Sequence, residues 1–158
     1  MTQIKYQVDK LLQATFGIAD QDAYEFVKLA QKEAKDGGYF VYEVNSKQEF
    51  RRSLYISKAM LIYARYFLDI VIIDTTYRRN RFNLPLVNVI GINNCGQNIM
   101  LAFSLLSEET SDSYTWFFNK LKEAWGTLKP LNFVTDDCKE IKQGKIIYIV
   151  FFFICFRV

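Results

Sequence analysis

The chain has 158 residues, of which 51% are hydrophobic and 16% aromatic, and its formal net charge is +3. This content of apolar side chains is ample for one buried core, so the composition argues against intrinsic disorder. Histidine is absent, which excludes a Ser/His/Asp or Cys/His catalytic set and a zinc finger of paired Cys and His. Acid–base or metal chemistry must therefore depend on Asp and Glu.

The cysteines and the mild charge limit the class of protein further. Cys95, Cys138 and Cys155 are odd in number and far apart, which favours reduced thiols over a disulfide framework. The positive charge is weaker than that of a dedicated nucleic-acid-binding module, so net charge alone does not indicate a partner.

The first half of the chain predicts two helices around a hairpin. Apolar residues at helical spacing indicate a helix over 21–35, which Gly37 can end. Aromatic and β-branched residues over 39–44 and 50–56 predict the two strands of a hairpin. Ser57 can then cap a short helix.

The second half begins with three predicted strands. The uninterrupted β-branched run over 70–73 is typical of a strand buried on both faces, and we expect Asp74 to end it. Strands over 86–92 and 98–106 flank an Asn-Asn-Cys-Gly sequence that suits a tight turn. These three segments are predicted to form a meander.

A helix and a further strand complete the predicted order. Ser111 can cap a helix whose apolar residues recur with a period near 3.6 as far as Trp125, which we expect in the core. A short strand over 131–135 follows, and a connection through a helix implies that it lies parallel in the sheet by a right-handed crossover. The predicted class is α/β, with a ribonuclease H-like mixed sheet flanked by helices. Other α/β folds stay open at this point.

The chemical signal is a pair of carboxylates, each placed directly after an apolar strand. Asp74 follows the run 70–73, and Asp136 follows 132–135. If the two strands are neighbours, the carboxylates can converge, and their repulsion and desolvation favour a bound divalent cation. Oxygen ligands suit Mg²⁺ or Mn²⁺, and two such ions can clamp the attacking and leaving oxygens of a phosphoryl transfer.

Simpler interpretations of these acidic residues stay open. Asp74 and Asp136 could be turn or capping residues, since Asp after a strand commonly forms an Asx turn. Asp137 is a second candidate ligand, although strand alternation points its side chain elsewhere. We interpret Asp69 as a cap. Glu109 and the preceding Glu108 are poorer candidates for a third ligand because they lie in a strand-to-helix loop.

An ordered set of motifs carries a resemblance to a known family. The segment 69–78, Asp-Ile-Val-Ile-Ile-Asp-Thr-Thr-Tyr-Arg, is followed by Asn-Leu-Pro-Leu-Val at 83–87, Val-Ile-Gly-Ile-Asn at 89–93 and Val-Thr-Asp-Asp at 134–137. This set resembles the MULE (Mutator-like element) transposase domain, which is shared with plant far-red-impaired-response transcription factors. The resemblance covers roughly 69–140.

The resemblance implies a ribonuclease H-like fold with an Asp, Asp, Glu triad that holds Mg²⁺ or Mn²⁺ and acts on transposon ends in DNA. By motif position Asp74 and Asp136 take the first two places, and the third glutamate has no counterpart here. The implied function is that of a partial DDE-type transposase domain for metal-dependent DNA strand cleavage and transfer, inactive as this fragment. It also implies a homo-oligomer on DNA and a nuclear location.

Two other functions stay open. One is a domesticated, non-catalytic DNA-associated regulator or scaffold of the same family. The other, of a different class, is an α/β binding protein whose two aspartates only cap turns. Arg78, Arg79 and Arg81 are candidates for contact with DNA phosphates, with a solvated basic turn as the alternative.

We divide the chain into three regions. Residues 1–68 form an N-terminal helix and hairpin extension, and residues 69–145 form the partial transposase domain, incomplete at its C-terminus. The tail 146–158 is apolar but shorter than the ~20 residues that span a bilayer, so we expect no association with a membrane. Our hypothesis for this tail is translated intron or frameshifted sequence.

Overall fold

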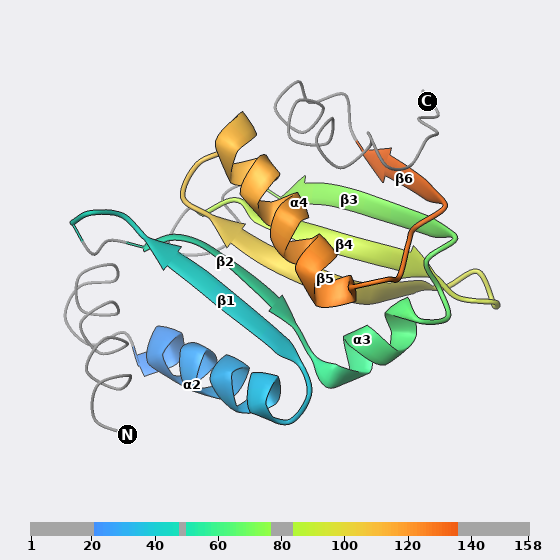
Figure 1. The fold of residues 1–158 in the computed structure, drawn as a ribbon, viewed down its shortest axis with the longest axis horizontal. Coiled ribbons are helices and arrows are strands. Elements are labelled where there is room, and N and C mark those ends of the chain that lie inside the picture. The colour runs from blue at the N-terminus through green and yellow to red at the C-terminus, as the bar shows by residue number, and fades with distance from the viewer. Residues whose placement is uncertain (1–20, 48–49, 77–83, 136–158) are drawn as a thin grey trace.

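The computed structural model describes residues 21–47, 50–76 and 84–135, which form helices and one twisted sheet (Figure 1). Asp136, the three candidate arginines and the apolar tail lie outside these residues. The elements in chain order are α2 (Gln21–Lys35), β1 (Tyr39–Val44), β2 (Phe50–Ile56), α3 (Lys58–Ala64), β3 (Ile70–Thr76), β4 (Leu86–Ile92), β5 (Asn98–Leu106), α4 (Ser111–Trp125) and β6 (Asn132–Thr135).

The ends of several elements follow from local chemistry that the sequence indicates. α2 is followed by Gly37 at φ +102°, and α4 is followed by Gly126 at φ +58°, a backbone region that favours glycine. Ser57 caps α3 as predicted. The cap of α4 is Thr110 rather than Ser111, because the Thr110 hydroxyl accepts the Ser113 N–H at 3.2 Å.

The six strands lie in the order β1-β2-β5-β4-β3-β6. All neighbouring pairs are antiparallel except β3 and β6, which are parallel. The predicted meander of β3, β4 and β5 and the parallel addition of β6 through α4 are both confirmed. Because β2 pairs with β5, the N-terminal hairpin belongs to this same sheet. The result is a mixed sheet flanked by helices, consistent with the expected ribonuclease H-like arrangement.

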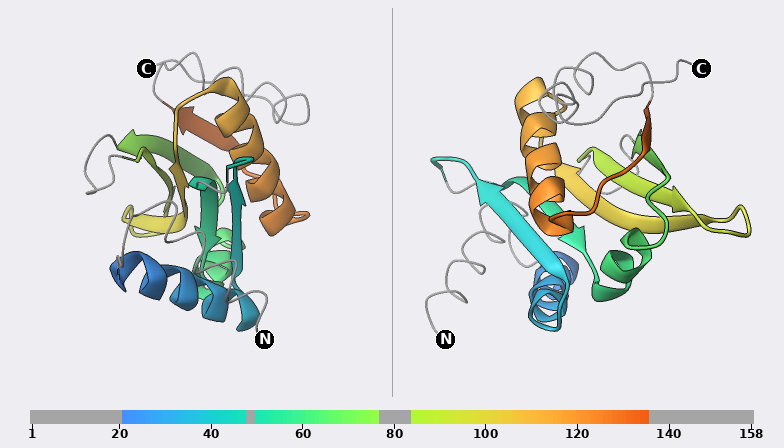
Figure 2. Two further views of the ribbon diagram at one scale, coloured as in Figure 1. Left: turned by 90° about the vertical axis from the view of Figure 1, so that its left-hand side faces the viewer. Right: turned by 45° about the vertical axis from the view of Figure 1, so that its right-hand side comes forward.

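The main core lies between the sheet and α4, which crosses one face of the strands (Figures 1 and 2). Seven α4 residues are buried, and Trp125 is only 3% exposed, as predicted. α3 closes the same core at one end with Ala64. At the start of β1, Tyr39 donates a hydrogen bond to Glu123 of α4, and burial together with this carboxylate raises the pKa of Tyr39 to about 12.

α2 packs against β1 on the side of the sheet away from α4. Leu54 and Ile56 of β2 face the main core, so Tyr55 between them points to the other side. α2 lies on this second side (Figure 2). Burial, and after it the charge of Glu33 on α2, raises the pKa of Tyr55. Of the helices in the described residues, none has the length and apolar character needed to cross a membrane.

The structure corrects two expectations about β3. The strand does not end at Asp74 but continues to Thr76, because pairing with β4 extends to Thr76 opposite Leu86. It is also not buried on both faces. Val71, Ile73 and Thr75 are buried against the α4 side, whereas Ile70 is 40% exposed and Asp74 is exposed on the other side.

Candidate metal-binding site

β3 and β6, the two strands that precede the predicted carboxylates in the sequence, are paired neighbours in the sheet. β3 and β6 run parallel with Ile73 opposite Thr135. Asp74 follows Ile73 in the sequence, and Asp136 follows Thr135. Ile73 and Thr135, the last described pair of this parallel ladder, therefore directly precede the two aspartates in the sequence. Asp136 itself lies outside the described residues.

Asp74 belongs to a small polar group on the open side of β3. It lies opposite Asn88 of β4 in the antiparallel register. Thr76 donates to Asp74 Oδ2 at 3.5 Å, at the limit of a hydrogen bond, and Asn88 Nδ2 donates to Thr76 Oγ1 at 3.3 Å. These contacts orient an exposed carboxylate loosely and leave most of its lone pairs available to a ligand.

Thr75 lies between Asp74 and Thr76 in the sequence. Its side chain joins a hydrogen-bond chain on the buried side of the strand. Tyr114 of α4 donates its hydroxyl proton to Glu109 Oε1 at 2.9 Å. A phenol has one proton, so the 3.1 Å contact between Thr75 Oγ1 and the Tyr114 hydroxyl requires Thr75 to be the donor. The chain thus runs from Thr75 to Tyr114 to Glu109.

Sequence reasoning missed this chain. Tyr114 falls among the apolar positions of the helix predicted to run from Ser111 to Trp125, and it is fully buried. A tyrosine at an apolar position of a helix does indicate such a bond, because the hydroxyl of a buried tyrosine usually requires a hydrogen-bond partner. The sequence indicates Glu109 only as a poorer candidate for a third metal ligand, whereas in the structure Glu109 is half-buried and accepts a hydrogen bond from Tyr114.

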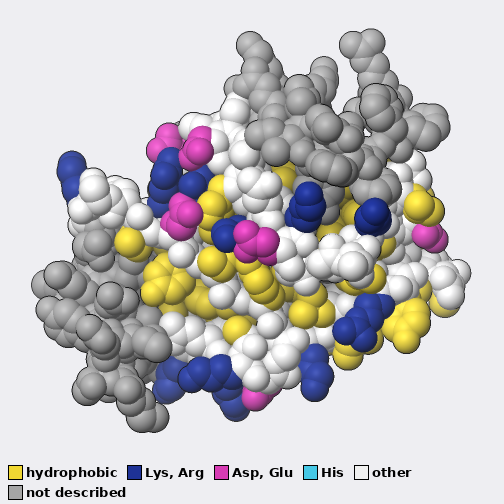
Figure 3. Space-filling model, in the orientation of Figure 1, with side chains coloured by type: hydrophobic (Ala, Val, Ile, Leu, Met, Phe, Trp, Pro, Cys, Tyr) yellow, Lys and Arg dark blue, Asp and Glu magenta, His cyan; other side chains and the backbone are white. Residues whose placement is uncertain are grey.

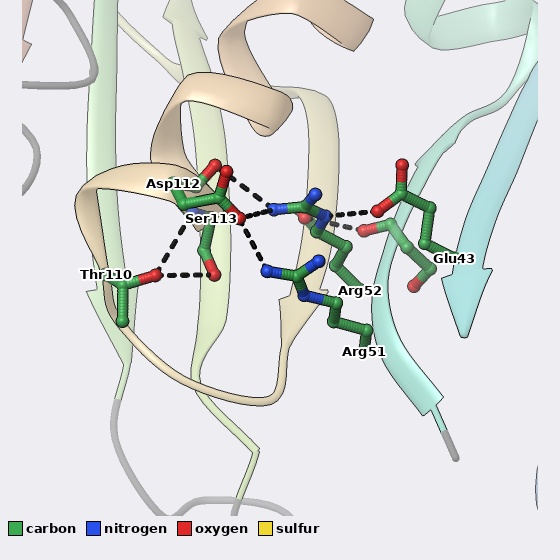
Figure 4. Close-up of polar contacts among 8 residues, drawn as sticks. Glu43, Arg51, Arg52, Thr110, Asp112 and Ser113 are labelled. Carbon is green, nitrogen blue, oxygen red and sulfur yellow. Dashed lines mark hydrogen bonds and ion pairs between the residues drawn. The ribbon is translucent and has the colours of Figure 1, made fainter. Parts of the chain in front are cut away.

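An ionic cluster joins the first turn of α4 to the hairpin (Figure 4). Tyr114 is the fourth residue of this helix. The Arg52 side chain is 7% exposed and donates to Glu43 at 2.7 Å and to the Asp112 carboxylate at 2.8 Å. It also donates to the Asp112 carbonyl at 3.1 Å and lies 5.1 Å from the centre of the Trp116 ring. Arg51, which is 41% exposed, contacts the same Asp112 oxygen at 2.7 Å. The hairpin and the start of α4 are therefore joined.

The donor atoms near Asp74 suit a hard cation. The exposed Asp74 carboxylate and the Thr76 hydroxyl provide oxygen, the ligand atom that Mg²⁺ and Mn²⁺ prefer, and the Asn88 amide nitrogen donates to Thr76. Over residues 21–47, 50–76 and 84–135, no three His, Cys, Asp or Glu side chains are grouped to hold a metal ion. Asp74 thus fits one position of a metal site whose second predicted ligand lies outside these ranges.

The remaining predicted residues fall outside the described ranges. Arg78, Arg79 and Arg81 follow β3 after Thr76, and Asp137 adjoins Asp136. On the face shown in Figure 3, Lys and Arg side chains are dispersed and interleaved with Asp and Glu rather than gathered in one basic band. This distribution agrees with the mild net charge of +3.

Comparison with known proteins identifies the family. The model of the MULE transposase domain matches residues 70–151, just over half of the chain and including the first six residues of the apolar tail. Protein FAR1-RELATED SEQUENCE 6 of Arabidopsis thaliana is 29% identical over 109 residues, which cover 67% of this chain and 15% of that protein. Protein FAR-RED IMPAIRED RESPONSE 1 of the same plant is 27% identical over 139 residues, which cover 87% of this chain and 17% of that protein.

Protein FAR1-RELATED SEQUENCE 5 of Arabidopsis thaliana is 38% identical over a shorter stretch of 71 residues, 45% of this chain and 9% of that protein. The chain therefore spans less than a fifth of the length of each of these three relatives. The match to the family model begins at β3 and includes both predicted carboxylate positions. The chain belongs to the MULE transposase domain family.

Proposed function

We propose that this chain provides the metal-binding edge of a DNA strand-cleaving and strand-joining site. The parallel register of β3 and β6, with Ile73 opposite Thr135, carries this proposal. Asp74 and Asp136 would hold Mg²⁺ or Mn²⁺, because two adjacent carboxylates are stabilised when a divalent cation joins them. The metal would activate a water or 3′-hydroxyl nucleophile and stabilise the leaving oxygen of an in-line phosphoryl transfer.

The residues of the chain would position the metal and the DNA. Asp74 is held in a paired strand, with Thr76 and Asn88 beside its carboxylate. Arg78, which follows this strand closely, and its neighbours Arg79 and Arg81 would bind phosphates of transposon ends, so that binding weakens with salt. Assembly as a homo-oligomer on DNA and a nuclear location belong to this same proposal.

Calorimetric titration with Mn²⁺ tests the metal site. We expect binding by the wild-type chain and its loss in both Asp74→Asn and Asp136→Asn, because each change removes one anionic ligand while preserving size. Asp69→Asn is the matched control, since Asp69 is exposed at the opposite end of β3. Five residues along a strand separate Asp69 from Asp74 by roughly 16 Å. Binding that is lost equally in Asp69→Asn, or that survives in Asp74→Asn, would contradict the proposal.

A second function is favoured by the similarity to Protein FAR-RED IMPAIRED RESPONSE 1 over 87% of the chain. In this alternative the domain is a non-catalytic, DNA-associated regulatory module. Mn²⁺ titration separates the two functions, because only the first requires a metal at Asp74 and Asp136. A nicking assay on supercoiled DNA with Mn²⁺ then tests whether these residues cleave DNA by themselves. We expect no nicking by these 158 residues alone, because two carboxylates hold a catalytic metal pair less completely than three. Nicking that disappears in Asp74→Asn would instead assign cleavage to this chain.

A further inference from the structure

We propose that Tyr114 is a positioning residue for the Asp74 carboxylate, acting through its hydrogen bond with Thr75. This inference rests on the proposed metal site. Thr75 is the residue between Asp74 and Thr76, and its hydroxyl lies 3.1 Å from that of Tyr114. The two residues are 39 positions apart in the sequence and come from different layers of the fold, β3 and α4.

The segment of β3 that carries Asp74 is paired with β4, and this pairing continues to Thr76 opposite Leu86. The bond from the buried face of Thr75 to Tyr114 adds a second, perpendicular constraint on the strand that carries the carboxylate.

Tyr114 can serve as an anchor because it is itself immobilised. Its side chain is fully buried, and its hydroxyl donates to Glu109 at 2.9 Å, so the acceptor lone pair is directed to Thr75. The turn of α4 from which it projects begins at the Thr110 cap and is bound through Asp112 to Arg52 of the hairpin. Rigid support of this kind fixes the orientation of a metal ligand.

Mn²⁺ titration of Tyr114→Phe tests the role, since this variant removes only the hydroxyl and keeps the buried ring. We expect binding to weaken about tenfold, as for other residues that orient a metal ligand. Thr75→Val should give a similar loss, and the double variant should be no weaker than either single one, because both remove one bond. Affinity equal to the wild type in Tyr114→Phe would overturn the assignment.

Two matched variants separate positioning from other roles. Ser104→Ala removes a different buried hydroxyl, which donates to the Ser53 carbonyl between β5 and β2, and should leave the Mn²⁺ affinity unchanged. An equal loss in Ser104→Ala would show a global effect and overturn the inference. Glu109→Gln keeps an acceptor for Tyr114 and should bind nearly as the wild type does. A loss as large as in Asp74→Asn would make Glu109 a ligand and overturn the inference too.

Amide hydrogen exchange without metal distinguishes failure of this inference from failure of the proposed function. In Tyr114→Phe the amides of residues 74–76 should exchange faster than in the wild type, while those of 70–73 stay protected by β4 and β6. Unchanged exchange at 74–76 would overturn the positioning role, even if the metal site is correct. If exchange rises but the wild-type chain binds no Mn²⁺, the proposed metal site fails, and with it the role of Tyr114 at that site.

Discussion

Two neighbouring arginines share one partner but differ in burial. Arg51 and Arg52 both contact Asp112 Oδ2, at 2.7 and 2.8 Å. Arg52 is 7% exposed and also binds Glu43 and the Asp112 carbonyl, whereas Arg51 is 41% exposed. Charge-assisted bonds in a buried, geometrically fixed cluster stabilise a fold more than one exposed ion pair. Arg52 should therefore provide most of the attachment between the hairpin and α4.

Replacement of each arginine by methionine tests this difference. Arg52→Met should lower the free energy of unfolding by about 2 kcal/mol, because several charge-assisted hydrogen bonds are lost. Arg51→Met should lower it by less than about 1 kcal/mol, since an exposed pair is screened by water. Urea denaturation followed by far-UV circular dichroism measures both. An equal loss of unfolding free energy in the two variants would show that burial does not determine how much each arginine stabilises the fold.

At the scale of elements, the position of β6 determines whether the two carboxylate positions meet. β6 has four residues and, among the described strands, pairs only with β3. Phe133, which is 6% exposed, anchors it in the core, with its ring edge-on to Phe118 at 6.3 Å. Phe133 is the buried residue of β6, so its packing should help to hold the register that places Thr135 opposite Ile73.

Phe133→Ala should therefore cost about 3 kcal/mol of unfolding free energy, as expected for deletion of a buried aromatic ring. Leu131→Ala is its control, because Leu131 lies just before the same strand but is 62% exposed. That variant should change stability by less than about 0.5 kcal/mol. Thermal or urea unfolding distinguishes the two. A stable Phe133→Ala chain would mean that backbone pairing with β3 alone holds β6.

The elements were largely predictable because their signals are local. Alternating or helical patterns, and glycines such as Gly37 and Gly126 at positive φ, mark the ends of strands and helices in the sequence itself. β3 was harder, because its apolar run does not reveal which face is covered. Only the packing of α4 on one side shows that Val71 and Ile73 are core residues while Ile70 is exposed.

For the whole molecule, the sequence predicts the parallel placement of β6 but not the contacts that this placement creates. The crossover rule for a strand, helix and strand predicts the parallel direction of β6, whereas its pairing with β3 is seen in the structure. The bond between Thr75 and Tyr114, and the cluster around Arg52, join residues 39 and 60 positions apart. No periodic pattern encodes such pairs. Asp136 remains a sequence-based prediction, because it lies outside the described residues.

The most direct test of the account is an anomalous diffraction map from crystals of this chain grown or soaked with Mn²⁺. We predict a peak at the edge of the sheet where β3 and β6 end, within ligand distance of the carboxylate oxygens of both Asp74 and Asp136. The peak should be absent from crystals of Asp74→Asn under the same conditions. A saturated crystal with no peak at this edge, or with Mn²⁺ bound only elsewhere, would contradict the assignment of the metal site.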